Sequence, residues 1–132
     1  PRMGFAHVIP EIIEKFKKEK TVKVYSPNHT RSFCYIDDAI NQIVNLSIKN
    51  KFKNNIYNIG NDMEEIKIID LVKKIAHILK SNKKIQKKES TIGSPPRRRP
   101  NLKKIKKLIN IKSVTNLNDG LKKTIKWYYE KI

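Results

Sequence analysis

The sequence has few of the residues that build disulfide frameworks, nucleotide-binding turns or membrane spans. Cys34 is the single cysteine among 132 residues, so an intrachain disulfide is excluded and a reducing compartment is favoured. The four glycines, Gly4, Gly60, Gly93 and Gly120, are too far apart to form a glycine-rich turn such as Gly-x-Gly-x-x-Gly. No apolar run approaches the length of a membrane span and no signal peptide is recognisable, so the sequence predicts a cytoplasmic protein.

Acidic residues are also scarce. Twelve Asp and Glu face thirty Lys and Arg, which gives a net charge of +18. A strongly basic chain is a formal candidate for binding a polyanion. However, the lysines are spread over what read as solvated helix faces, and no zinc-finger spacing, helix-turn-helix or aromatic RNA-binding stripe accompanies them. A composition rich in Lys, Asn and Ile is typical of AT-rich coding sequence, so the charge by itself does not indicate a nucleic-acid partner.

Arginine is rare, and its positions are informative. Five of the thirty basic residues are Arg, and four of the five lie in two short motifs, 31–38 (Arg-Ser-Phe-Cys-Tyr-Ile-Asp-Asp) and 93–100 (Gly-Ser-Pro-Pro-Arg-Arg-Arg-Pro). The planar guanidinium group binds phosphate through two hydrogen bonds, whereas an ammonium group acts as a hydrated point charge. A chain that uses Lys elsewhere and Arg at two sites therefore indicates a phosphate-containing ligand.

The hydrophobic periodicity predicts a single α/β domain over residues 1–132. We expect Asp37 or Asp38 to cap the second helix, whose apolar face includes Ile40 and Ile43, and Asn101 to cap the fourth. Residues 93–100 read as a loop. The predicted helices span about residues 8–16, 37–48, 66–79, 101–109 and 117–129, and the predicted strands span 21–25, 32–36, 55–59 and 85–89.

Several motifs, in order, carry a resemblance to a known family. They are Pro1-Arg2, Val8-Ile9-Pro10, residues 30–38, Tyr57-Asn58-Ile59-Gly60-Asn61, residues 95–101, and residues 117–121 with 124–128. Together they resemble the C-terminal part of the extended short-chain dehydrogenase/reductases, which include nucleotide-sugar 4-epimerases, 4,6-dehydratases and UDP-glucuronate decarboxylases. The motifs around Arg31 and Arg98 are most similar to the decarboxylases.

The resemblance implies a fold and a set of binding residues. The fold is the substrate-binding lobe of a Rossmann-type enzyme, with a small incomplete sheet and about five helices; residues 55–59 join the missing sheet and leave Ile56 and Ile59 partly uncovered. Arg31 and a late-loop Arg, best matched by Arg98, contact the diphosphate of a nucleotide-sugar. The late-loop neighbour Arg99, together with Asn58 and His7, completes the implied site. Alternatives stay open: a surface ion pair for the two arginines, an exposed His7 and a turn-forming Asn58.

The same resemblance implies parts that this sequence does not contain. The family binds NAD through a glycine-rich turn and catalyses with Tyr-x-x-x-Lys, and no Tyr here has Lys four positions later. We therefore expect no NAD binding, no catalytic residue and no activity from this chain by itself, and NAD only in the complete enzyme. The start at Pro1 suggests a fragment or one half of a split protein, with a Rossmann half supplied by the remainder of the enzyme or by a separate polypeptide. Family members are often homodimers.

Other reactive side chains carry structural interpretations. Cys34 is expected to be a small buried residue, and Asp37 and Asp38 are expected to be caps rather than an acid–base pair. The three histidines lack metal-ligand spacing. Residues 26–30 are shorter than the family's glycine-containing loop, which leaves substrate choice open. Three functions thus remain: the substrate-binding lobe of a nucleotide-sugar enzyme, a non-catalytic nucleotide-sugar-binding remnant, and a basic polyanion-binding module.

Overall fold

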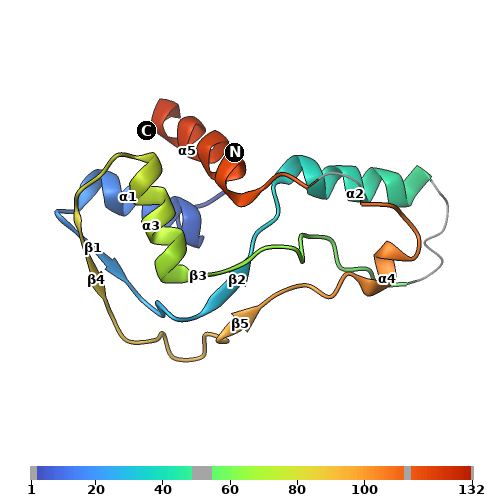
Figure 1. The fold of residues 1–132 in the computed structure, drawn as a ribbon, viewed down its shortest axis with the longest axis horizontal. Helices are drawn as coiled ribbons and strands as arrows, with labels where there is room; N and C mark the ends of the chain where they lie inside the picture. Colours follow the sequence, from blue (N-terminus) through green and yellow to red (C-terminus); the bar gives the residue numbers. More distant parts are fainter. Residues whose placement is uncertain (1–2, 49–54, 112–113, 132) are drawn as a thin grey trace.

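In the computed structural model the described residues are 3–48, 55–111 and 114–131 (Figure 1). Helices and strands alternate along this part of the chain, in agreement with the predicted α/β class. The helices are α1 (Val8–Lys18), α2 (Ile36–Ile48), α3 (Ile68–Ile78), α4 (Lys103–Lys106) and α5 (Leu117–Lys131). The strands are β1 (Thr21–Val24), β2 (Thr30–Ser32), β3 (Glu65–Lys67), β4 (Lys84–Lys87) and β5 (Arg97–Arg98).

The main body of the molecule is built from α1, α3 and α5 around the parallel pair β1 and β4. Each helix turns an apolar stripe inward, as the periodicity predicts. Ile13 of α1, Val22 of β1 and Ile75 of α3 are fully buried, and Leu121 of α5 is nearly so. This continuous core holds α1, β1, α3 and α5 in place relative to one another.

A second, three-stranded sheet extends from the body in the order β3-β2-β5. β2 pairs antiparallel with β3 and parallel with β5, so it is the central strand. Thr30 is the register partner of Arg97, and Arg31 is the register partner of Arg98. Register partners on neighbouring strands share one face of a sheet, so the two arginine-bearing motifs predicted from the sequence lie side by side.

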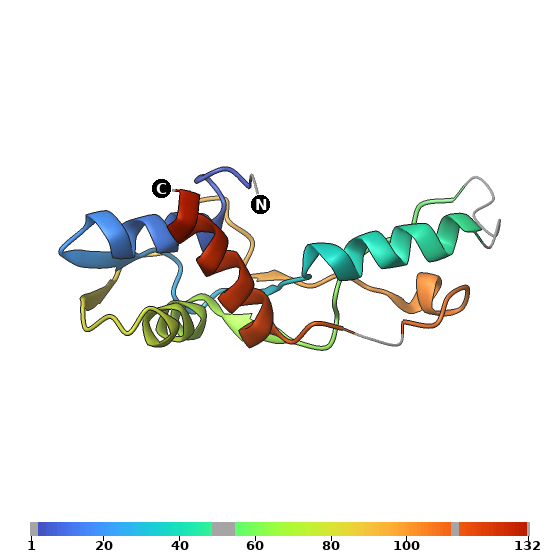
Figure 2. The same ribbon diagram turned by 90° about the horizontal axis from the view of Figure 1, so that it is seen from above.

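An arm formed by α2 and α4 projects from this sheet, away from the body (Figure 2). A small cluster of Leu102, Ile105 and Ile109, in and beside α4, forms the buried centre of the arm. The buried side chains of α2 are polar, namely Asp38 and Gln42. Leu46 packs against the same cluster. Five other apolar side chains of α2 are exposed to between 46% and 76%, namely Ile36, Ile40, Ile43, Val44 and Ile48. α2 therefore presents most of its large apolar side chains outward, although it buries Asp38 and Gln42.

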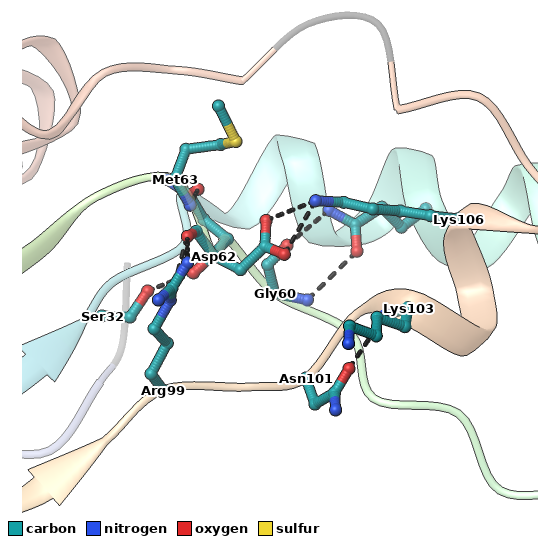
Figure 3. Close-up of polar contacts among 10 residues, drawn as sticks. Ser32, Gly60, Asp62, Met63, Arg99, Asn101, Lys103 and Lys106 are labelled. Carbon is teal, nitrogen blue, oxygen red and sulfur yellow. Dashed lines mark hydrogen bonds and ion pairs between the residues drawn. The ribbon is translucent and has the colours of Figure 1, made fainter.

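The turn at residues 60–63 ties the arm to the sheet (Figure 3). Gln42 of α2 accepts a hydrogen bond from the Gly60 backbone nitrogen at 3.0 Å and donates one to the Gly60 carbonyl at 2.8 Å. The Ser32 hydroxyl donates to the Asn61 carbonyl, and the Asp62 carboxylate holds Lys106 at 2.7 Å. Glycine suits the first position of this turn, because an added Cβ there would lie 3.0 Å from the ring of Pro100.

The structure corrects several predicted elements. Residues 55–59 are extended but not assigned as a strand, since the described chain offers them no pairing strand. Ile56 is nevertheless 87% exposed, as expected for an uncovered position. The fourth helix is a single turn, Lys103–Lys106, rather than the predicted span of residues 101–109. Lysines three and four positions apart disfavour a longer helix here. The sheet is divided into two small sheets rather than one.

The predicted cap is also wrong for both Asp37 and Asp38, which lie inside the first turn of α2. α2 begins at Ile36, and the Asp38 carboxylate accepts hydrogen bonds from the backbone nitrogen of Thr115 at 2.7 Å and from its hydroxyl at 3.2 Å. Asp38 thus holds the segment that leads into α5. Asn101 accepts a hydrogen bond from the Lys103 backbone nitrogen at 3.0 Å, but the N-cap position of α4 is Leu102, one residue later than predicted.

Candidate functional site

A cavity of about 680 Å³ lies where the body, the β3-β2-β5 sheet and the arm meet. Its walls come from the segment before α1, from β2 and the start of α2, from the first turns of α5, and from the residues around β5. Arg31, Arg98 and His7 line it, together with Ser94 and Tyr35. The fold therefore brings two motifs separated by 54 residues of sequence into one concave site.

Arg31 is held in place by two hydrogen bonds. Its Nη1 donates to the Thr30 carbonyl at 2.7 Å, and its Nη2 donates to the Ser94 hydroxyl at 3.1 Å. Burial, and then the positive charge of Arg98, lower the pKa of Arg31. Two guanidinium groups held close together repel each other, and an anion between them relieves that repulsion.

The side chains of the three consecutive arginines, Arg97, Arg98 and Arg99, point in different directions and have different partners. Arg97 forms a bidentate pair with Glu65: its Nε donates to Oε1 at 2.8 Å and its Nη2 donates to Oε2 at 2.7 Å. Arg99 donates from Nε and Nη2 to the Asp62 carbonyl, at 3.0 Å and 2.5 Å (Figure 3). Arg98 lines the cavity beside Arg31. Because side chains alternate between the two faces of a strand, Arg98 is the member of the triplet that is turned toward the cavity.

Of the five site residues expected from the sequence, three line the cavity and two do not. Arg31, Arg98 and His7 lie together at the cavity. Arg99 is engaged with Asp62, and the side chain of Asn58 donates to the Asn101 carbonyl at 3.1 Å. Neither residue is part of the described cavity lining, and for both a contact with a ligand stays a prediction. Sequence reasoning missed Ser94, although its place beside the late arginines was the available signal.

Cys34 lines the cavity but is a poor nucleophile. Burial, and then the negative charge of Asp38, raise the pKa of its thiol. The thiol therefore stays protonated at neutral pH, and the thiolate is the reactive form. No group of three or more His, Cys, Asp or Glu side chains within the described ranges could hold a metal ion.

No helix in residues 3–48, 55–111 or 114–131 combines the length and the apolar character that crossing a bilayer requires.

Comparisons with known proteins show which proteins this chain is similar to. Residues 2–60 match the model of the NAD dependent epimerase/dehydratase family. The UDP-glucuronic acid decarboxylase 1 of Danio rerio is 32% identical over 127 residues, which are 96% of this chain and 30% of that protein. The chain is related to the NAD-dependent epimerase/dehydratase family. The UDP-glucuronic acid decarboxylase 3 of Arabidopsis thaliana is 27% identical over 124 residues, or 92% of this chain.

Solved structures of this family share the fold. A UDP-glucuronic acid 4-epimerase from Bacillus cereus, solved with UDP-glucuronic acid and NAD, has a TM-score of 0.85 at 24% identity and is matched over 42% of its length. A UDP-glucose 4-epimerase from Thermotoga maritima, solved with UDP-glucose, has a TM-score of 0.83 at 22% identity. The chain spans about a third of the length of the first curated relatives and less than half of each of these two structures.

Proposed function

We propose that this chain is the nucleotide-sugar-binding lobe of an NAD-dependent epimerase, dehydratase or decarboxylase, in which Arg31 and Arg98 hold the diphosphate. UDP-sugars are the favoured ligands, because the curated relatives include UDP-glucuronic acid decarboxylases and two of the structures that share the fold contain UDP-sugars. His7 lies at the same cavity and is the third candidate contact.

One observation carries the proposal: Arg31 and Arg98 are register partners on adjacent parallel strands and line the same cavity. A diphosphate carries about two negative charges, and two guanidinium groups can each give it charge-assisted hydrogen bonds. The two groups come from neighbouring strands of one sheet, rather than from opposite walls of a cleft. This arrangement suits a linear diphosphate that lies across β2 and β5.

The exposed side of α2 supports a second part of the proposal, namely that a nucleotide-binding unit covers it in the working enzyme. Five large apolar side chains are presented outward there, and Ile56 is exposed beside the arm. Apolar patches of this kind mark surfaces that pack against another unit. The four glycines do not fit an NAD-binding turn. NAD would therefore be bound by the nucleotide-binding unit, which is part of the same polypeptide or of another one.

Calorimetric titration with UDP tests the binding role. Replacing Arg31 or Arg98 by Ala should cost roughly 1.5–3 kcal/mol of binding free energy, since a charge-assisted hydrogen bond is lost in each case. Arg31→Lys and Arg98→Lys should recover part of it, because ammonium cannot reproduce the fork. Lys122→Ala is the control. Lys122 lies on α5 near Asp119 and outside the cavity lining, so its loss should change little.

The titration also separates the three functions. Equal losses for Arg98→Ala and Lys122→Ala, with a steep dependence on salt and comparable binding of DNA, would indicate diffuse polyanion attraction instead. Specific UDP binding that persists without turnover, even when a nucleotide-binding unit is supplied, would indicate a non-catalytic remnant. Specific binding together with turnover in the completed enzyme is the result that we expect.

A further inference from the structure

A charged network lies on the face of the β3-β2-β5 sheet that is opposite the cavity. Glu65 of β3 accepts two hydrogen bonds from Arg97 of β5, and its Oε1 also accepts one from the Thr30 hydroxyl at 2.5 Å. Bidentate Arg–carboxylate pairs fix direction as well as distance. The network therefore spans all three strands of the small sheet.

β5 is only two residues long, so its own pairing with β2 holds its register weakly and side-chain contacts can decide it. β2 lies between β3 and β5, so the Glu65–Arg97 pair crosses it at Thr30, which is the register partner of Arg97. The next register pair along the strands is Arg31 and Arg98. A slip of one residue along a strand turns every side chain to the other face. Such a slip in the Arg97–Arg99 triplet would replace Arg98 at the cavity by a neighbouring arginine.

We infer that Glu65 and Arg97 are positioning residues that hold β5 in the register where Arg98 faces the cavity beside Arg31. The inference rests on the proposed function for the meaning of that cavity, but the register itself is a property of the chain alone. Neither Glu65 nor Arg97 is part of the cavity lining, so both act through Arg98.

Glu65→Gln tests the inference in the full chain, because its two possible effects on UDP binding have opposite signs. The substitution removes one negative charge, so diffuse electrostatics would tighten the binding of anionic UDP. Loss of the Arg97 pair should instead raise the dissociation constant for UDP about three- to tenfold. Glu130→Gln is the matched control, since it makes the same charge change on α5, where Glu130 lies 3.8 Å from Lys126.

Two further measurements distinguish positioning from a general loss of stability. In an Arg98→Ala background, Glu65→Gln should change UDP affinity less than about twofold, because its route to the ligand is gone. The Nε–Hε resonance of Arg98, observed by NMR without ligand, should show greater side-chain motion in Glu65→Gln than in the original chain. Arg97→Gln breaks the same pair from the other side and should reproduce both results.

Weaker UDP binding together with a more mobile Arg98 supports the inference. Unchanged or tighter binding in Glu65→Gln, matching Glu130→Gln, overturns it. If the original chain does not bind UDP, the proposed function fails, and the Arg98 resonance alone decides the inference: an unchanged resonance in both Glu65→Gln and Arg97→Gln overturns it.

Discussion

α3 and α2 make an instructive pair, because two helices of similar length and apolar spacing meet opposite environments. α3 buries its apolar stripe completely, with Leu71, Val72 and Ile75 all at 0% exposure. α2 leaves Ile40 and Ile43 about half exposed and buries Asp38 and Gln42 instead. A hydrophobic stripe thus predicts that a helix packs against something, but not that the partner lies within the described chain. The apolar side chains of α3 in the body are covered within the described chain, whereas most of those on α2 in the arm are not.

The largest expected difference comes from matched isoleucine substitutions in the two regions. Ile75→Ala should lower the free energy of unfolding by about 2–5 kcal/mol, because it leaves a cavity in a closed core. Ile43→Ala should cost less than about 1 kcal/mol, since half of that side chain is already in contact with water and Ala favours helix. Urea denaturation measures both. Equal costs would mean that the apolar side of α2 is covered within this chain.

The second largest effect is expected at the contact between Gln42 of the arm and the backbone of Gly60. Gln42→Ala removes the partner of both the nitrogen and the carbonyl oxygen of Gly60 in a buried position, which should cost about 1–3 kcal/mol. Asn45→Ala is the control on the same helix, because Asn45 is exposed and its side chain donates to the Asn41 carbonyl one turn earlier, at 2.8 Å. Urea denaturation of the two variants should separate them, and similar values would contradict a special role for the Gly60 contact.

The smallest expected effect is the pH dependence of the Glu65–Arg97 pair. Hydrogen bonds from Arg97 and then Thr30 lower the pKa of Glu65 from 4.5 to about 2. A carboxyl whose pKa is depressed by folding contributes stability above its unfolded pKa and loses it as the pH falls through the folded value. The difference in stability between the original chain and Glu65→Gln should therefore be constant above about pH 5 and shrink toward pH 2. It should be small, because the pair is exposed and screened by solvent.

Arg97→Gln should give the same pH profile, since it removes the other partner of the pair. A difference that stays constant down to pH 2 would show that Glu65 gains nothing from being ionised in the folded chain.

The sequence predicted the α/β class and about five helices. The motifs that contain Arg31 and Arg98 do line one cavity, and their binding of a common ligand stays a prediction. The choice of Arg98 among the three consecutive arginines came from the family resemblance and not from the local sequence pattern. The orientation of these side chains depends on β5, a two-residue strand that pairs with β2 and carries the Arg97–Glu65 contact. The role of Asp38 was missed for a similar reason. Its partner Thr115 is distant in sequence, so local capping preference gave the wrong answer.

The central claim is that the cavity between body and arm binds a nucleoside diphosphate through Arg31 and Arg98. Its most direct test is an NMR titration of the full chain with UDP, in which the Nε–Hε resonances of the arginines are followed together. The account predicts that the Arg31 and Arg98 resonances shift and saturate at the same UDP concentration, while that of Arg97, bonded to Glu65, stays in place. Small, unsaturated shifts of all arginines alike would contradict it.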